Sequence, residues 1–114
     1  VQFNIDNEFI DAQLYQRSGD MFLGVPYNIA SYSFLLHIIG KITGYIPRYL
    51  HHVIGDAHIY ENHIEQVETQ LSRTANNFPQ LVMETISDIN KISESDFQIV
   101  NYKSDDRIIG QMTA

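Results

Sequence analysis

The chain has 114 residues, of which 44% are hydrophobic and 18% are charged, a balance typical of one globular domain rather than a disordered segment. Its formal net charge of −7 repels polyanions and argues against nucleic acid as the main partner, although one arginine can still hold one phosphate. The absence of cysteine excludes disulfides, thiolate metal sites and a cysteine nucleophile within these residues. No secretory signal pattern or membrane-spanning apolar stretch is visible, so we expect a cytoplasmic protein without a membrane partner.

The first elements expected along the chain are a pair of strands. Apolar and polar residues alternate over residues 1–5 and again over residues 10–14, the period of a half-buried strand. Asp6 and Asn7 lie between the two runs and tolerate the positive φ of a tight turn. This pattern predicts a hairpin.

Residues 28–43 change to a helical pattern, with apolar side chains at spacings of three and four. Asn28 stands where an N-cap is expected, and Gly44 stands just beyond the last helical residue. The apolar surface is wide, which predicts a mostly buried helix.

The remainder of the chain mixes both patterns. Residues 52–60 read as a strand, and an amphipathic helix follows with Ile64, Val67 and Leu71 on its inner face. Two short strands are expected at residues 80–86 and 97–102, with a polar loop at 88–96 between them. We see no repeat or linker, so the chain is interpreted as one unit of α/β or α+β class.

Two runs carry a recognisable signature. Residues 13–32 read QLYQRSGDMFLGVPYNIASY, and residues 55–60 read GDAHIY, followed by Asn62 and His63. Both runs, and more weakly the segment from Asp96 to the end, resemble the thymidylate synthases. The resemblance implies a mixed, largely antiparallel sheet with packed helices, and a homodimer. It identifies residues 1–114 as a partial fold, the C-terminal half of a single domain whose N-terminal half is missing.

The reaction of this family would need a residue that the chain lacks. In the family, a cysteine thiolate adds to C6 of dUMP, and 5,10-methylenetetrahydrofolate then supplies a methylene and a hydride to give dTMP. The resemblance places that cysteine in a Pro-Cys-His stretch just ahead of Val1. The chain is therefore expected to serve a methyltransferase while being inactive alone, with folate as co-substrate and no metal.

Resemblance also assigns the nucleotide-binding residues. Arg17 and Ser18 would hold the phosphate, and Arg17 would also favour the ionised thiolate. The carboxamide of Asn28 matches the O4 and N3–H of uracil, although a helix N-cap is the alternative role. The complete set expected to bind dUMP comprises Arg17, Ser18, Gly19, Asp20, Asn28, His58 and Tyr60, the last two contacting the ribose 3′-hydroxyl.

The folate site expected from the same resemblance comprises Asp20, Leu23, Gly24, Tyr27 and Thr113, with Asp20 accepting hydrogen bonds from the pterin. His51, His52 and His63 lack an acidic partner at metal-binding spacing and are interpreted as structural. Two stretches depart from the family pattern: residues 104–107, which replace a turn containing proline and histidine, and the weakly apolar end of the chain.

Two other interpretations remain open from the sequence. A dUMP hydroxymethylase of the same superfamily would deliver the one-carbon unit to water instead of reducing it. Alternatively, the chain is a non-catalytic nucleotide-binding or dimerisation piece of a split gene.

Overall fold

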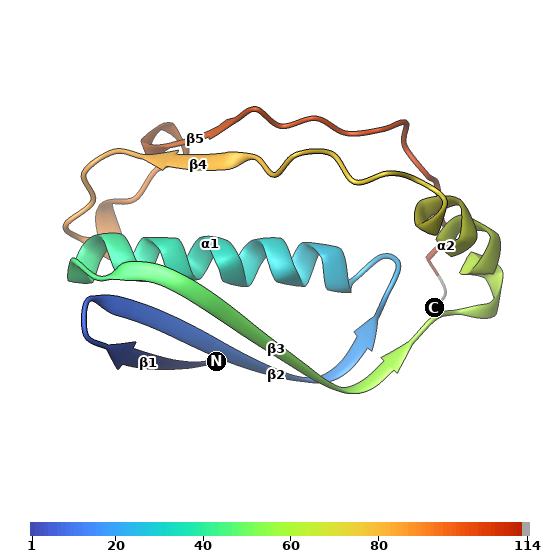
Figure 1. The fold of residues 1–114 in the computed structure, drawn as a ribbon, viewed down its shortest axis with the longest axis horizontal. Coiled ribbons are helices and arrows are strands. Elements are labelled where there is room, and N and C mark those ends of the chain that lie inside the picture. The colour runs from blue at the N-terminus through green and yellow to red at the C-terminus, as the bar shows by residue number, and fades with distance from the viewer. Residues whose placement is uncertain (113–114) are drawn as a thin grey trace.

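A computed structural model describes residues 1–112. A three-stranded sheet of order β1-β2-β3 forms its base (Figure 1). Strand β1 (Gln2–Asp6) pairs antiparallel with β2 (Phe9–Asp20), and Asn7 has the positive φ of 54° in the turn between them. Strand β3 (Ile46–His58) pairs parallel with β2 along nearly its whole length. The mixed sheet and the α/β class agree with the sequence-based prediction.

Helix α1 (Val25–Thr43) starts three residues earlier than predicted. Gly24 occupies the N-cap position, and the fixed φ of Pro26 suits the first helical turn. The N-cap prediction for Asn28 is therefore wrong: the backbone N–H of Asn28 donates to Gly24 O at 3.0 Å, inside the helix. At the other end, Gly44 terminates the helix as predicted, with a φ of 80°.

The core lies between α1 and the inner face of the sheet. Ile10, Ala12 and Leu36 form its buried centre. The prediction of a mostly buried helix is wrong, because Tyr27 is 76% exposed and other side chains of α1 are only partly covered. The sheet covers one flank of the helix. On another flank, Phe34 packs against Phe97, with the ring centroids 4.6 Å apart.

An ion-pair cluster joins β3 to the hairpin. The guanidinium of Arg48 binds both carboxylate oxygens of Asp11, at 3.1 and 2.7 Å, and reaches Asp6 at 3.1 Å. The hydrogen bond from Arg48 lowers the pKa of the Asp11 carboxyl; partial burial opposes this, and the backbone N–H of Tyr49 adds to it. Strand β3 also begins earlier than predicted, at Ile46. Pro47 is tolerated near its start because β3 is an edge of the described sheet, where the N–H that proline lacks is not needed.

The elements after β3 are short. A 3₁₀ turn at Glu61–His63 leads into α2 (Ile64–Leu71), and the antiparallel pair β4 (Gln80–Met83) and β5 (Phe97–Val100) lies across α1 from the sheet (Figure 1). Both strands end earlier than predicted, β5 where Asn101 adopts a φ of 60°. The expected loop contains two 3₁₀ turns, Ile89–Lys91 and Glu94–Asp96. No helix in the described part of the chain is long and apolar enough to cross a membrane.

Candidate functional site

The predicted site residues gather where β2 and β3 end beside the start of α1. Parallel pairing brings Ser18 opposite Asp56 and Asp20 opposite His58. Since both strands run in the same direction, their carboxyl ends meet at one edge of the sheet. In open α/β sheets that edge is the usual place for a ligand.

Gln16, which the sequence-based prediction did not include, connects three of these elements. Its Nε2 donates to Asn28 Oδ1 at 3.0 Å and to the backbone O of Ser18 at 2.8 Å. Its Oε1 lies 2.9 Å from Nε2 of His52. The glutamine thus fixes the side-chain orientation of Asn28 from the neighbouring strand. Gln16 stands inside the signature run, but only the strand-to-helix packing identifies its role.

The Asn28 side chain is partly buried and does not cap α1. Because Oδ1 accepts from Gln16, the amide face of Asn28 is determined: Nδ2 is left as a donor, and Oδ1 keeps a second lone pair. A carboxamide in this state can pair with a group that carries an adjacent acceptor and donor.

Arg17 and Ser18 lie in the last third of β2. The Arg17 residue is exposed, and its guanidinium forms no hydrogen bond or ion pair with residues 1–112. A free guanidinium can bind an anion through a planar pair of donors. Ser18 is partly buried and Gly19 is buried beside it.

Asp20 organises the turn that starts α1. Its Oδ1 accepts from the backbone N–H groups of Phe22 and Leu23, at 3.0 and 3.3 Å. The carbonyl of Asp20 accepts from Gly24 at 3.1 Å. Asp20 is therefore not a solvated loop aspartate: one carboxylate oxygen belongs to the turn, and Oδ2 remains able to accept a further hydrogen bond.

His58 and Tyr60 lie at and just beyond the end of β3. Their rings meet edge to face, with centroids 5.2 Å apart and planes at 89°. His58 Nδ1 is buried, lies 3.6 Å from Asp56 Oδ2 and has no hydrogen-bond partner among the described residues.

A cavity of about 400 Å³ opens beside the first turn of α1. Leu23 and Tyr27, both predicted to contact folate, line it from the helix side. Tyr102 and Ile108, both beyond β5, also line it. Gly24 caps α1 and is not among the lining residues, while Thr113 lies outside the described residues.

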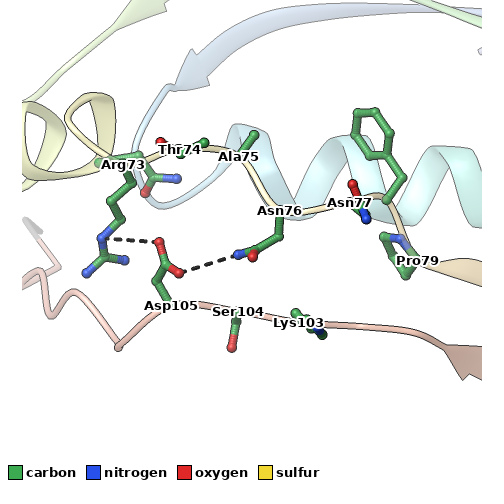
Figure 2. Close-up of a pocket in the computed structure, with 11 residues that line it drawn as sticks. Arg73, Thr74, Ala75, Asn76, Asn77, Pro79, Lys103, Ser104 and Asp105 are labelled. Atoms are coloured by element: carbon green, nitrogen blue, oxygen red, sulfur yellow. Dashed lines mark hydrogen bonds and ion pairs between the residues drawn. The ribbon is translucent and has the colours of Figure 1, made fainter.

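A second cavity, of about 390 Å³, is lined by none of the predicted site residues but shares Gln70 and Arg73 with the first (Figure 2). Figure 2 shows Arg73 and Asn76 pointing across it toward Asp105, at 3.9 and 3.4 Å. Asp105 belongs to the stretch that departs from the family pattern.

Among residues 1–112, no group of three or more metal-ligating side chains comes together. His51 and His52 lie on β3, and His63 is buried in the 3₁₀ turn that leads into α2. The site therefore consists of one free guanidinium, an oriented carboxamide, an imidazole beside a phenol and an adjoining cavity, which suits a ligand with an anionic group and a planar polar ring.

Comparison with known proteins shows the family of the chain. The thymidylate synthase family profile matches residues 1–114. The chain is 46% identical over 111 residues to a thymidylate synthase of Mycoplasma genitalium, covering 97% of this chain and 39% of that protein. It is 51% identical over 104 residues to the enzyme of Mycoplasma mobile, covering 90% of this chain and 36% of the relative.

The similarity extends to a viral protein. A thymidylate synthase of human herpesvirus 8 is 46% identical over 102 residues, with 89% of this chain and 30% of the relative aligned. The chain belongs to the thymidylate synthase family, which confirms the resemblance noted in the sequence. It spans less than two fifths of the length of these relatives.

Proposed function

We propose that the chain supplies the nucleotide- and folate-binding part of a thymidylate synthase that methylates dUMP to dTMP. The observation that carries the proposal is the Gln16–Asn28 hydrogen bond, which gives the Asn28 carboxamide a defined orientation at the end of the sheet where Arg17 also lies, on β2. The relatives named thymidylate synthase support the same reaction.

In this proposal each group has one role. Arg17, with Ser18 beside it, binds the phosphate, and Asn28 donates to O4 and accepts from N3–H of uracil. His58 and Tyr60 hydrogen-bond the ribose 3′-hydroxyl. The partly apolar cavity beside Leu23 and Tyr27 receives the folate, and the free oxygen of Asp20 accepts from its pterin.

The remaining chemistry comes from outside these residues. Methylenetetrahydrofolate supplies the one-carbon unit and the hydride. The nucleophilic thiolate would belong to an N-terminal portion, because the chain has no cysteine. We propose a cytoplasmic homodimer in which that portion completes the site, and no methyl transfer by residues 1–114 alone.

The Asn28→Asp substitution tests the uracil assignment. A carboxylate still accepts the hydrogen bond from Gln16, so the position of the side chain is retained while its donor is lost. It suits the exocyclic amine of cytosine and repels O4 of uracil. We expect the ratio of dUMP to dCMP affinity to fall by about tenfold to a hundredfold.

The chain combined with the N-terminal portion of a thymidylate synthase should be titrated calorimetrically with both nucleotides. Asn4→Asp, an exposed change on β1, is the matched control and should leave the ratio unaltered. An unaltered ratio in Asn28→Asp would refute the uracil assignment. Chromatography of the product distinguishes dTMP from the hydroxymethyl nucleotide of the alternative enzyme.

Tritium release from C5-labelled dUMP tests the requirement for the N-terminal portion. Release is expected from the combined preparation and not from residues 1–114 alone. Release by the chain alone would contradict the proposal.

A further inference from the structure

We infer that His63 is a positioning residue that fixes the C-terminal segment, residues 108–112, against both sides of the proposed site. His63 is the largest fully buried side chain among the described residues, at 0% exposure. Histidine is rarely buried this completely without a specific partner. The sequence analysis interpreted His63 only as structural, and the proposed binding roles do not use it.

The imidazole donates to the C-terminal segment. Nε2 of His63 lies 2.7 Å from the backbone O of Gln111. A carbonyl oxygen can only accept, so Nε2 carries a proton, while Nδ1 is buried with no partner in the described chain. If the segment moved away, the buried Nε2–H would lose its acceptor as well. That loss opposes departure of the segment.

The same ring contacts both sides of the site. Its centroid lies 5.2 Å from the ring of Phe22, in the turn between Asp20 and α1, and 5.9 Å from the ring of Tyr60. The backbone N–H of His63 donates to Tyr60 O at 2.9 Å. The imidazole therefore touches the segment proposed to bind ribose and the turn that carries Leu23.

The C-terminal backbone approaches this ring very closely. A Cβ added at Gly110 would lie 2.7 Å from Cε1 of Phe22 and 3.1 Å from Nε2 of His63. Only glycine permits such an approach without displacement. A second side chain supports the segment, since Nε2 of Gln66, a partly buried residue of α2, donates to Ile109 O at 3.4 Å.

Three segments thus meet at one imidazole: the end of β3, the Asp20–Gly24 turn and residues 108–112. Ile108 lines the cavity assigned to folate. Displacement of the C-terminal segment would therefore open that cavity and leave the β3 side in place. This consequence for folate rests on the proposed function, whereas the positioning of the segment does not.

Limited trypsin digestion tests the positioning role in the complete protein that carries this chain. The bond after Arg107 immediately precedes the segment, and cleavage after Lys91 in the same digest is an internal control. His63→Phe keeps a ring and removes the donor, while His63→Gln keeps an amide donor near Nε2. We expect His63→Phe to accelerate cleavage after Arg107 by about fivefold or more, and His63→Gln to restore much of the protection.

Two results would overturn the inference. One is an unchanged rate after Arg107 in His63→Phe. The other is equal acceleration at Arg107 and Lys91, which would make His63 an ordinary core residue whose loss loosens the whole fold.

A kinetic measurement extends the test to the site. In the active combined enzyme, His63→Phe should raise the KM for methylenetetrahydrofolate severalfold and change the KM for dUMP much less, and His63→Gln should reverse the change. Equal changes in both KM values would contradict the selective effect on folate. If the unsubstituted enzyme has no activity, the proposed function fails, while the digestion result still decides the role of His63.

Discussion

The sheet with α1 and the segments that follow α2 differ in how their polar groups are partnered. In the first region, Asp11 binds Arg48 through both carboxylate oxygens, and Gln16 connects Asn28 to His52. In the second region, Asp105 makes only longer, exposed contacts at 3.4 and 3.9 Å. The apolar side chains differ in the same way: Leu36 is 4% exposed and Ile99 is 63% exposed.

This difference indicates how the site is divided. The groups proposed to recognise the nucleotide lie on long, paired elements, which hold a binding geometry more closely than loops do. The cavity proposed for folate is lined in part by Tyr102 and Ile108, in a stretch where residues 101–112 form no helix or strand and depend on a few contacts such as that of His63. We therefore expect closure of the folate cavity to be lost more easily than the geometry of the nucleotide-binding groups.

The largest effect should come from the core. Leu36→Ala should lower the free energy of unfolding by about 2–5 kcal/mol, because it removes buried methyl groups and leaves a cavity. Ile99→Ala on β5 should cost less than about 1 kcal/mol, because the side chain is already largely in water. Urea titration followed by circular dichroism measures both. Equal losses would show that the two regions are stabilised alike.

The next prediction compares how the loss of one arginine from each region changes the affinity for the nucleotide. Arg17→Ala should weaken dUMP binding by about 1.5–3 kcal/mol in the combined enzyme, the usual range for a hydrogen bond to a charged group. Arg73→Ala removes the same charge from a position that lines the cavity of Figure 2 and the proposed folate cavity but none of the proposed dUMP contacts, and it should leave dUMP binding nearly unaltered. Calorimetric titration is the measurement, and similar losses would indicate that long-range charge, not contact with the phosphate, determines affinity.

How much of this could be predicted depended on the distance between partners along the chain. Local patterns could be predicted from the sequence: the hairpin, the end of α1 at Gly44 and the family signature. The Arg48–Asp11 pair joins residues 37 apart, and the Gln16–Asn28 bond joins a strand to a helix. Neither follows from periodicity, because each depends on how β2 packs against its neighbours.

Local rules also misplaced some boundaries. Asn28 is a good N-cap by residue type, yet Gly24 and Pro26 start the helix because the Asp20 side chain closes the preceding turn. Strand β3 includes Pro47, ahead of the predicted start at residue 52, because an edge strand accepts proline without losing a hydrogen bond. At α1 a local hydrogen bond two residues along the chain determined the start of the helix, whereas at Pro47 the edge position of β3 in the sheet determined the start of the strand.

At acid pH, protonation of Asp11 should lower the free energy of unfolding of the first region, the sheet with α1. The folded pKa of its carboxyl is lowered, so the unfolded chain binds the proton more tightly. The contribution to stability is complete above the ordinary pKa of 3.8 and is lost as the pH falls through the lower folded pKa. Asp11→Asn should flatten stability over this acid range. An NMR titration of the Asp11 carboxyl gives the folded pKa directly, and Arg48→Gln should raise it; an unshifted titration in that variant would contradict the assigned cause.

The smallest effect is expected at Asp105 in the second region. Its contacts with Arg73 and Asn76 are long, and its side chain is 43% exposed, so water already screens the charge. Asp105→Ala should therefore change the free energy of unfolding by less than about 1 kcal/mol. Asp106→Ala changes the adjacent exposed aspartate, which has no ion pair or hydrogen bond within residues 1–112, and is the matched control. Urea titration of both variants should give nearly the same midpoint. A clearly larger loss for Asp105→Ala would mean that this cluster stabilises the second region as firmly as Arg48 and Asp11 stabilise the first, and the contrast between the regions would not hold.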